Sequence, residues 1–284
     1  MKRTLLVLTL LSLAPFTFAQ RIDDTNGKHT QLYPTKDKAP GWAKPGGGGG
    51  QNLVNHGGPT ITSAKSVAIF WGSQWADSHG NLNSIASDML GFFSQFGSSG
   101  EYKVITQYSG IQAASLTNSF WWDPSDPPTN VTDSALENEV IKYFGPAGGG
   151  SPDPNTIYSV FLPSTSYSSY GSSTSCGGPN LVYCAYHSNF SYGGTDIKYS
   201  SLPYPSCGGC HWTGFSVAND FEHFACHETR EAVTDPDGNA WFDRRGYEAD
   251  DKCAWSPAPF IGSGGYGYQW EWSNAVSGCV KTSP

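Results

Sequence analysis

The sequence predicts a mixed α/β or α+β fold, in which helices pack on a mixed sheet. Residues 66–75 and 156–164 are apolar runs of strand length bounded by Gly, Pro or polar residues, as buried strands are. Residues 84–96 place their large apolar side chains at helical spacing. Residues 133–144 follow a Pro-rich turn and predict a second helix. This order of elements favours helices on a sheet over an all-β sandwich.

The chain before the first predicted strand divides into two parts. Residues 1–19 have the basic start, the apolar run and the small residues near the end that are typical of a secretion signal peptide. Residues 20–52 are polar, include the run Gly46–Gly50 and lack a periodic apolar pattern, which indicates a flexible Gly/Pro-rich leader. We therefore expect a single folded domain over residues 53–284.

Charge and hydropathy limit the expected location of the protein and the classes of partner that it binds. No stretch approaches the roughly 20 apolar residues of a spanning helix, so we expect a secreted, extracellular protein that is not membrane-embedded. Without Lys2 and Arg3 the formal net charge falls by two, from −8 to about −10, which disfavours nucleic acid and anionic membranes as partners. Charged residues make up only 14% of the chain, compared with about 25% on average.

The seven cysteines all lie from Cys176 onward, within or after a Ser/Tyr/Gly-rich region that ends near Gly214. Export makes disulfide bonds the default expectation, although connectivity does not follow from sequence. Loops of limited length favour the pairs Cys176–Cys184, Cys207–Cys210 and Cys253–Cys279, with Cys226 left free. Because the region shows little periodicity, we expect disulfides to order it in place of a core.

A third helix is predicted in the segment that ends with "HFACHETREAVTDPDGNAWFD". Asn219 or Asp220 is a suitable N-cap, and Pro236 and Gly238 stop a helix that runs through Val233. Its small and aromatic residues gather on one side, which is the expected core face.

This helix carries the motif HExxE, formed by residues 227–231. His227 and Glu231 are four residues apart and project together, as the two histidines of the HExxH zinc peptidases do. We expect both to bind Zn²⁺, and we expect Glu228 to take the proton of a zinc-bound water. Arg230 falls on the exposed flank by the helical angle. HExxE alone also occurs on ordinary solvated helices, so its context matters.

Several landmarks supply that context. They are "NHGGPTITSAKSVAIFWGSQW" at 55–75, "YSVFLPS" in the second predicted strand, "PSCGGCHW" at 205–212, "CHETREAVTDPDGNAWFD" and "YEADDKCAW". In this order, from Asn55 to Cys253, they resemble the phosphate-induced, EXORDIUM-like secreted proteins of plants and their bacterial relatives. The cysteine loop is shorter than in that family, and Thr229 and Arg230 replace the usual small or apolar pair inside the motif.

The resemblance implies an EXORDIUM-like, zincin-type domain and a third metal ligand. The family carries a glutamate five residues before its cysteine, and Glu248 stands in that relation to Cys253. Asp251 is the first alternative. Asp237 is another, because it copies the third-ligand spacing of the longer HExxHxxGxxH motif. His223, one turn before His227, keeps an open role.

Two functions follow as hypotheses. The first is a secreted zinc-dependent hydrolase, a metallopeptidase that cleaves extracellular protein or peptide substrates. The second is a non-catalytic extracellular or cell-wall-associated protein with a structural or vestigial metal site, as the plant relatives are described. An open coordination position on the metal separates the two. The other histidines of the predicted domain are expected at the surface, and they are His56, His79, His187 and His211.

Overall fold

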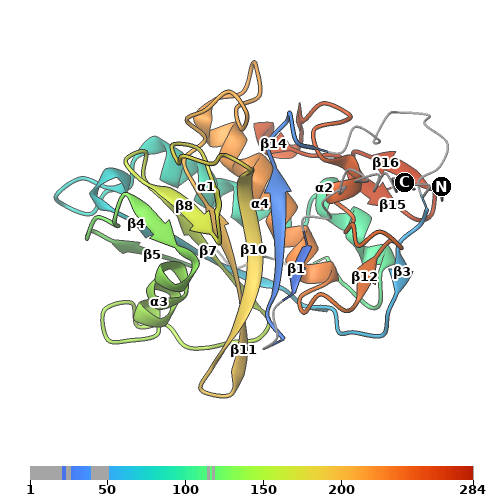
Figure 1. Ribbon diagram of the computed structural model, residues 1–284, viewed down its shortest axis with the longest axis horizontal. Coiled ribbons are helices and arrows are strands. Elements are labelled where there is room, and N and C mark those ends of the chain that lie inside the picture. Colours follow the sequence, from blue (N-terminus) through green and yellow to red (C-terminus); the bar gives the residue numbers. More distant parts are fainter. Residues whose placement is uncertain (1–20, 24–26, 40–50, 114–115, 117–118, 284) are drawn as a thin grey trace, which may run out of the picture.

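A mixed sheet of seven strands forms the centre of the molecule (Figure 1). The computed structural model describes residues 21–23, 27–39, 51–113, 116 and 119–283, so the predicted signal peptide lies outside the described residues. The strands lie in the order β1-β2-β10-β11-β7-β4-β5. They are β1 (Arg21–Asp23), β2 (His29–Pro34), β4 (Lys65–Trp71), β5 (Ser119–Asp123), β7 (Thr156–Phe161), β10 (Tyr183–Tyr192) and β11 (Thr195–Leu202).

The sheet is parallel from β5 to β11 and antiparallel from there to β1. Smaller sheets surround it, and their strands are β3 (Val54–Asn55), β6 (Asn130–Thr132), β8 (Tyr167–Tyr170), β9 (Ser173–Thr174), β12 (Trp241–Phe242), β13 (Phe260–Ile261), β14 (Gly267–Tyr268), β15 (Glu271–Ser273) and β16 (Gly278–Val280). The predicted α/β class with a mixed sheet is confirmed.

Helices cover both faces of the large sheet. The helical segments are α1 (Ser84–Phe96), α2 (Gly100–Lys103), α3 (Asp133–Tyr143), α4 (Val217–Thr234), η1 (Ser73–Trp75), η2 (Val104–Gln107), η3 (Asp251–Cys253) and η4 (Ser263–Gly265). Side chains of β4 alternate between two cores: Ala68 and Phe70 face α1 and α4, while Val67 and Ile69 face α3. This period of two is that of a strand buried on both sides.

Most of the predicted helices and strands are confirmed. The helix over 84–96 has the predicted bounds, and its N-cap Asn83 accepts a hydrogen bond from the backbone of Ala86. The two predicted buried strands exist but end earlier, at Trp71 and Phe161. The third helix begins earlier than expected, because Ser216 and Asn219 form a capping box that places the first turn at Val217.

The predicted flexible leader is wrong for residues 29–34, which form the fully buried strand β2. β2 pairs with β10, and Figure 1 shows it (blue) alongside that strand (yellow). Its side chains alternate: Leu32 joins the core under α3, whereas Tyr33 joins the core under α4. His29, Thr30 and Gln31 are polar and are held by specific partners, so hydrophobic periodicity did not reveal the strand. The run Gly46–Gly50 lies outside the described residues.

The Ser/Tyr-rich region before Gly214 is also more regular than predicted. It contains the hairpin of β10 and β11, which are the two longest strands described and are buried over most of their length. Tyrosine, serine and asparagine fill many of the buried positions, and several tyrosines pack on one another. A core built from these polar-tipped residues shows little apolar periodicity, which is why the region was expected to depend on disulfides alone.

Three disulfide bonds join Cys176 to Cys207, Cys184 to Cys210 and Cys253 to Cys279. Among the described residues Cys226 is a free, buried thiol. The expected third pair and the free Cys226 are confirmed, and the two other expected pairs are wrong. Cys184 lies on β10, and the sheet brings it to the loop of Cys207 and Cys210 instead of to its neighbour in sequence. The three bonds fit a protein of an oxidising, extracellular compartment.

The revised pairing gives a direct prediction. Mass spectrometry of a non-reduced proteolytic digest should find one cluster of peptides in which Cys207 and Cys210 bond to two different partners, because each thiol faces another strand or loop. Cleavage of the chain between Cys176 and Cys184 and of the peptide bond between Gly208 and Gly209 would then release Cys176–Cys207 and Cys184–Cys210 as separate species. A peptide with an internal Cys207–Cys210 bond would contradict this pairing.

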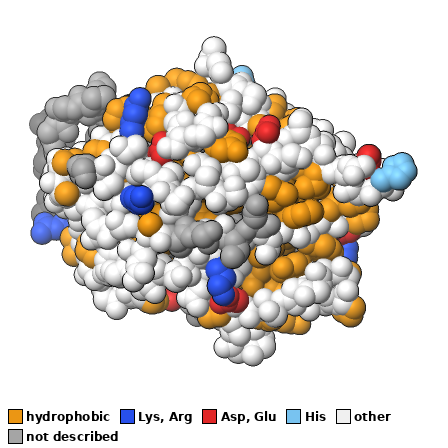
Figure 2. Space-filling view, turned by 180° about the vertical axis from the view of Figure 1, so that it is seen from behind, with side chains coloured by type: hydrophobic (Ala, Val, Ile, Leu, Met, Phe, Trp, Pro, Cys, Tyr) orange, Lys and Arg blue, Asp and Glu red, His pale blue; other side chains and the backbone are white. Residues whose placement is uncertain are grey.

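The surface agrees with the low charge of the sequence. On the face shown in Figure 2, uncharged polar and apolar side chains cover most of the surface, and the few basic and acidic side chains are scattered over it, some of them next to one another. Among the described residues of that face, the basic side chains form no patch of the kind that binds nucleic acid. No helix in the described part of the chain is long and apolar enough to cross a membrane.

Candidate metal centre

Helix α4 lies in the middle of the molecule. It packs against β10, β11 and β2 on one side and against β14 and α1 on the other. Every residue from Asp220 to Thr234 is therefore buried. The prediction that Arg230 is exposed is wrong, because the C-terminal segments cover the flank that the helical angle left to solvent. Such a helix needs a partner for each of its polar side chains.

His227 projects from α4 with its two ring nitrogens in different surroundings. Nδ1 lies 3.3 Å from Oε1 of Gln269, whose amide nitrogen donates to the backbone carbonyl of Asp250. The Gln269 oxygen is thus an acceptor, so Nδ1 carries the proton of a neutral ring. Burial lowers the pKa of His227, which favours that neutral ring. Nε2 is left with a lone pair, as a metal ligand requires.

Two carboxylate oxygens face Nε2 of His227. His227 Nε2 lies 3.0 Å from Glu231 Oε2 and 3.8 Å from Asp251 Oδ1. In the described part of the chain neither His227 Nε2 nor Glu231 Oε2 has a hydrogen-bond partner, although both are buried. Burial is also the main cause that raises the pKa values of Glu231 and Asp251. A cation between these atoms would relieve the desolvation of all three groups.

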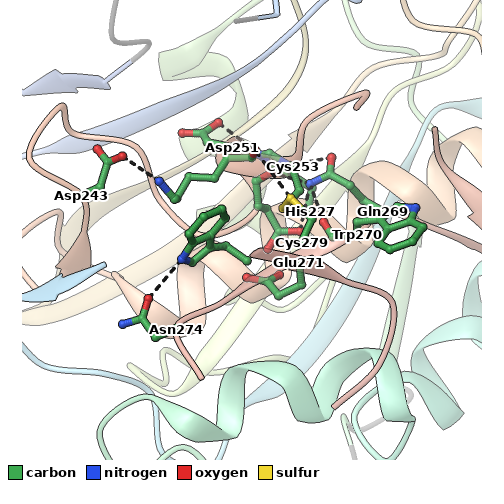
Figure 3. The surroundings of a disulfide bond; sticks show 12 residues. His227, Asp243, Asp251, Cys253, Gln269, Trp270, Glu271, Asn274 and Cys279 are labelled. Atoms are coloured by element: carbon green, nitrogen blue, oxygen red, sulfur yellow. Dashed lines mark hydrogen bonds and ion pairs between the residues drawn. A yellow bond between two sulfur atoms is a disulfide. The ribbon is translucent and has the colours of Figure 1, made fainter. Parts of the chain in front are cut away.

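The structure groups Asp251, and not Glu248, with His227 and Glu231. The backbone nitrogen of Asp251 donates to Glu231 Oε1 over 2.9 Å, and Gln31 donates to Asp251 Oδ2. These bonds leave Oδ1 directed toward His227. Figure 3 shows Asp251 and Gln269 on two sides of His227, beside the Cys253–Cys279 disulfide that ties η3 to β16.

Glu228, the predicted base, lies on the side of α4 that faces β10. Its Oε2 is 3.1 Å from Nδ1 of His187, and its Oε1 is buried with no hydrogen-bond partner in the described residues. Burial and, next, the charge of Glu231 raise the pKa of Glu228 well above its usual value. A cation nearby would oppose this shift and favour the ionised form of Glu228.

His187 is the residue that sequence reasoning missed. It was expected at the surface, but it is 1% exposed and points from β10 toward α4. Once β10 is known to be a strand, its alternation places His187 on the α4 side, since Ala185 faces the core under α4 and Tyr186 and Phe190 face the core under α3. His187 shares the α4 side with Ala185.

Two further candidates lie apart from this group. His223 Nε2 is 2.9 Å from the hydroxyl of Tyr33, and burial together with His227 lowers the pKa of His223 to about 3. Asp237 forms an ion pair with Lys198 on β11. Neither belongs to a set of convergent ligand atoms among the described residues.

Strand β2 covers the candidate metal centre. The Tyr33 ring lies against the ring of His227, with the centroids 4.1 Å apart, and Gln31 contacts Asp251. His227, Glu228 and Glu231 are all 0% exposed. Solvent or substrate can reach them only if a covering segment moves.

The fold and this centre define an α/β protein with a buried cluster of histidines and carboxylates on one central helix. In comparisons with protein-family models, curated proteins and solved structures, nothing matches this chain.

Proposed function

We propose that this protein is a secreted, zinc-dependent hydrolase of zincin-like architecture that cleaves extracellular proteins or peptides. His227, Glu231 and Asp251 hold the zinc ion. The convergence of His227 Nε2, Glu231 Oε2 and Asp251 Oδ1 in a buried place, with the first two unsatisfied, is the observation that carries the proposal. One imidazole and two carboxylates are ligands that zinc accepts, and three protein ligands leave a position for water.

The chain's own residues supply the acid–base chemistry. Zinc held by these residues would lower the pKa of a bound water to about 7. Glu228 would accept a proton from water on Oε1, the oxygen with no hydrogen-bond partner in the described residues, and would later donate it to the leaving amine. His187 holds the other oxygen of Glu228 and fixes the direction of the carboxylate. The positive ion also favours the ionised form of Glu228 that this step needs.

The burial of the centre favours one rival, a non-catalytic extracellular protein in which the ion is structural. All three HExxE side chains are buried, and Tyr33 of β2 packs on His227. A structural ion explains that burial directly, whereas a hydrolase requires β2 or a neighbouring segment to move aside. In this rival the same residues bind the ion, but the protein does not catalyse hydrolysis.

The zinc content of purified variants tests the ligand assignment. After dialysis against dilute zinc, Asp251→Asn and His227→Ala should each hold one equivalent less zinc than the wild type, because each loses one of three protein ligands. Asp88→Asn, a change at an exposed position on α1, is the matched control and should hold as much zinc as the wild type.

Two outcomes would count against the proposal in different ways. A wild-type protein that binds no zinc removes the hydrolase and its rival together. If Asp251→Asn keeps the wild-type zinc content while Glu248→Gln loses the ion shared with His227, Glu248 is the third ligand, as the family resemblance implied.

A further inference from the structure

A second set of ligand atoms lies next to the first. His29 on β2, His187 on β10 and Glu248 in the segment before η3 each offer one atom, and these atoms all lie within 4.8 Å of one another. The three residues are 2%, 1% and 1% exposed. They come from parts of the chain that are far apart in sequence, and the pairing of β2 with β10 brings His29 and His187 together.

His187 gives the independent sign of a ligand. Because Nδ1 lies beside the carboxylate of Glu228, it is the nitrogen that carries the proton. Nε2 then has a lone pair, no hydrogen-bond partner in the described residues, and an oxygen of Glu248 3.9 Å away. A histidine that donates one N–H to a carboxylate and directs its other nitrogen at a cation is the common arrangement in metal sites.

Contacts with β10, Glu248 and Gly238 hold the His29 side chain at this second set of ligand atoms. Its backbone nitrogen donates to Asn189 on β10 over 2.8 Å, and its Nε2 lies 3.0 Å from Glu248 Oε1. The ring packs against Gly238, which has φ of +67°, and a Cβ at Gly238 would lie only 2.3 Å from His29 Nδ1. The turn after α4 therefore needs glycine both for its backbone and for the close approach of this ring.

We propose that His29, His187 and Glu248 form a second site for a divalent cation, and that this cation is zinc. Two imidazole nitrogens and one carboxylate are a donor set that zinc takes in proteins. The ion would join β2, the hairpin of β10 and β11, and the segment that carries Asp251. It thereby fixes the strand that covers the first site, whether or not that site is catalytic.

The stoichiometry of the full-length protein tests this proposal. After equilibration with zinc and removal of the excess, elemental analysis should find two equivalents per wild-type chain. His29→Gln should keep one, and His227→Ala should keep the other. His79→Gln, at an exposed position, is the matched control and should keep two.

The outcomes separate the two sites. One equivalent in the wild type that is unchanged in His29→Gln and lost in His227→Ala overturns the second site and leaves the proposed function standing. One equivalent that is lost in His29→Gln and kept in His227→Ala supports the second site and removes the first.

A measurement on the wild type does not depend on whether the variants fold. Anomalous scattering at the zinc edge from crystals grown with zinc should show two peaks, one of them enclosed by His29, His187 and Glu248. A single peak beside His227 would overturn the proposal.

Gly238→Ala serves as a further variant, since it displaces the His29 ring without altering any proposed ligand. It should reduce the zinc content to one equivalent per chain.

Discussion

Glu228→Gln should abolish hydrolysis while zinc binding and the fold remain intact. Glutamine has the same shape and still accepts a hydrogen bond from His187, but it cannot take a proton from water. General acid–base catalysis contributes on the order of 10²- to 10⁴-fold in rate, so the cleavage rate should fall by at least that factor. The measurement is cleavage of a broad peptide library, read by mass spectrometry, together with zinc content.

Glu222→Gln provides the matched control for this variant. Glu222 is also a buried glutamate of α4, but it accepts hydrogen bonds from Gly267 and Asn219, away from the candidate ligands. Its replacement should leave hydrolysis unchanged. Equal activity of Glu228→Gln and wild type would exclude Glu228 as the base. A wild type that binds zinc and cleaves no peptide in the library would favour the structural rival.

Arg230→Met should lower the free energy of unfolding by about 3–5 kcal/mol, the usual loss when one member of a buried ion pair is removed. Arg230 is 0% exposed, donates to Asp250 and forms an ion pair with Glu271, whose Oε2 lies 2.7 Å from Arg230 Nε; both acids are also 0% exposed. It further donates to the backbone carbonyls of Glu101 and Gln269. Its removal leaves a buried charge and several acceptors without a partner.

Urea unfolding followed by circular dichroism measures this loss. Arg244→Met removes the same charge at an exposed position and should change stability by less than about 0.5 kcal/mol. Arg230→Lys keeps the charge but cannot reproduce the forked contact, so its loss should be intermediate. If Arg230→Met were as stable as Arg244→Met, the buried ion pairs would not hold the C-terminal segments on α4.

The sequence by itself determined the local elements and the pair of candidate ligands on one helix. Helix α1 was predicted at both of its ends, because a regular apolar stripe is a local signal. The buried strands β4 and β7 were predicted from their apolar runs. His227 and Glu231 were placed together because a helix brings residues four apart to the same side, whatever surrounds it.

Only the tertiary structure decided which other residues surround His227 and Glu231. His29 and His187 reach the centre because β2 pairs with β10, and neither strand has the apolar periodicity from which a buried strand is predicted. Asp251 is directed at His227 by a backbone contact to Glu231 and by Gln31, 220 residues away in sequence from Asp251. Arg230 is buried because the C-terminal segments fold back over α4. Each of these contacts joins distant parts of the chain, and local spacing carries no information about which distant segments will meet.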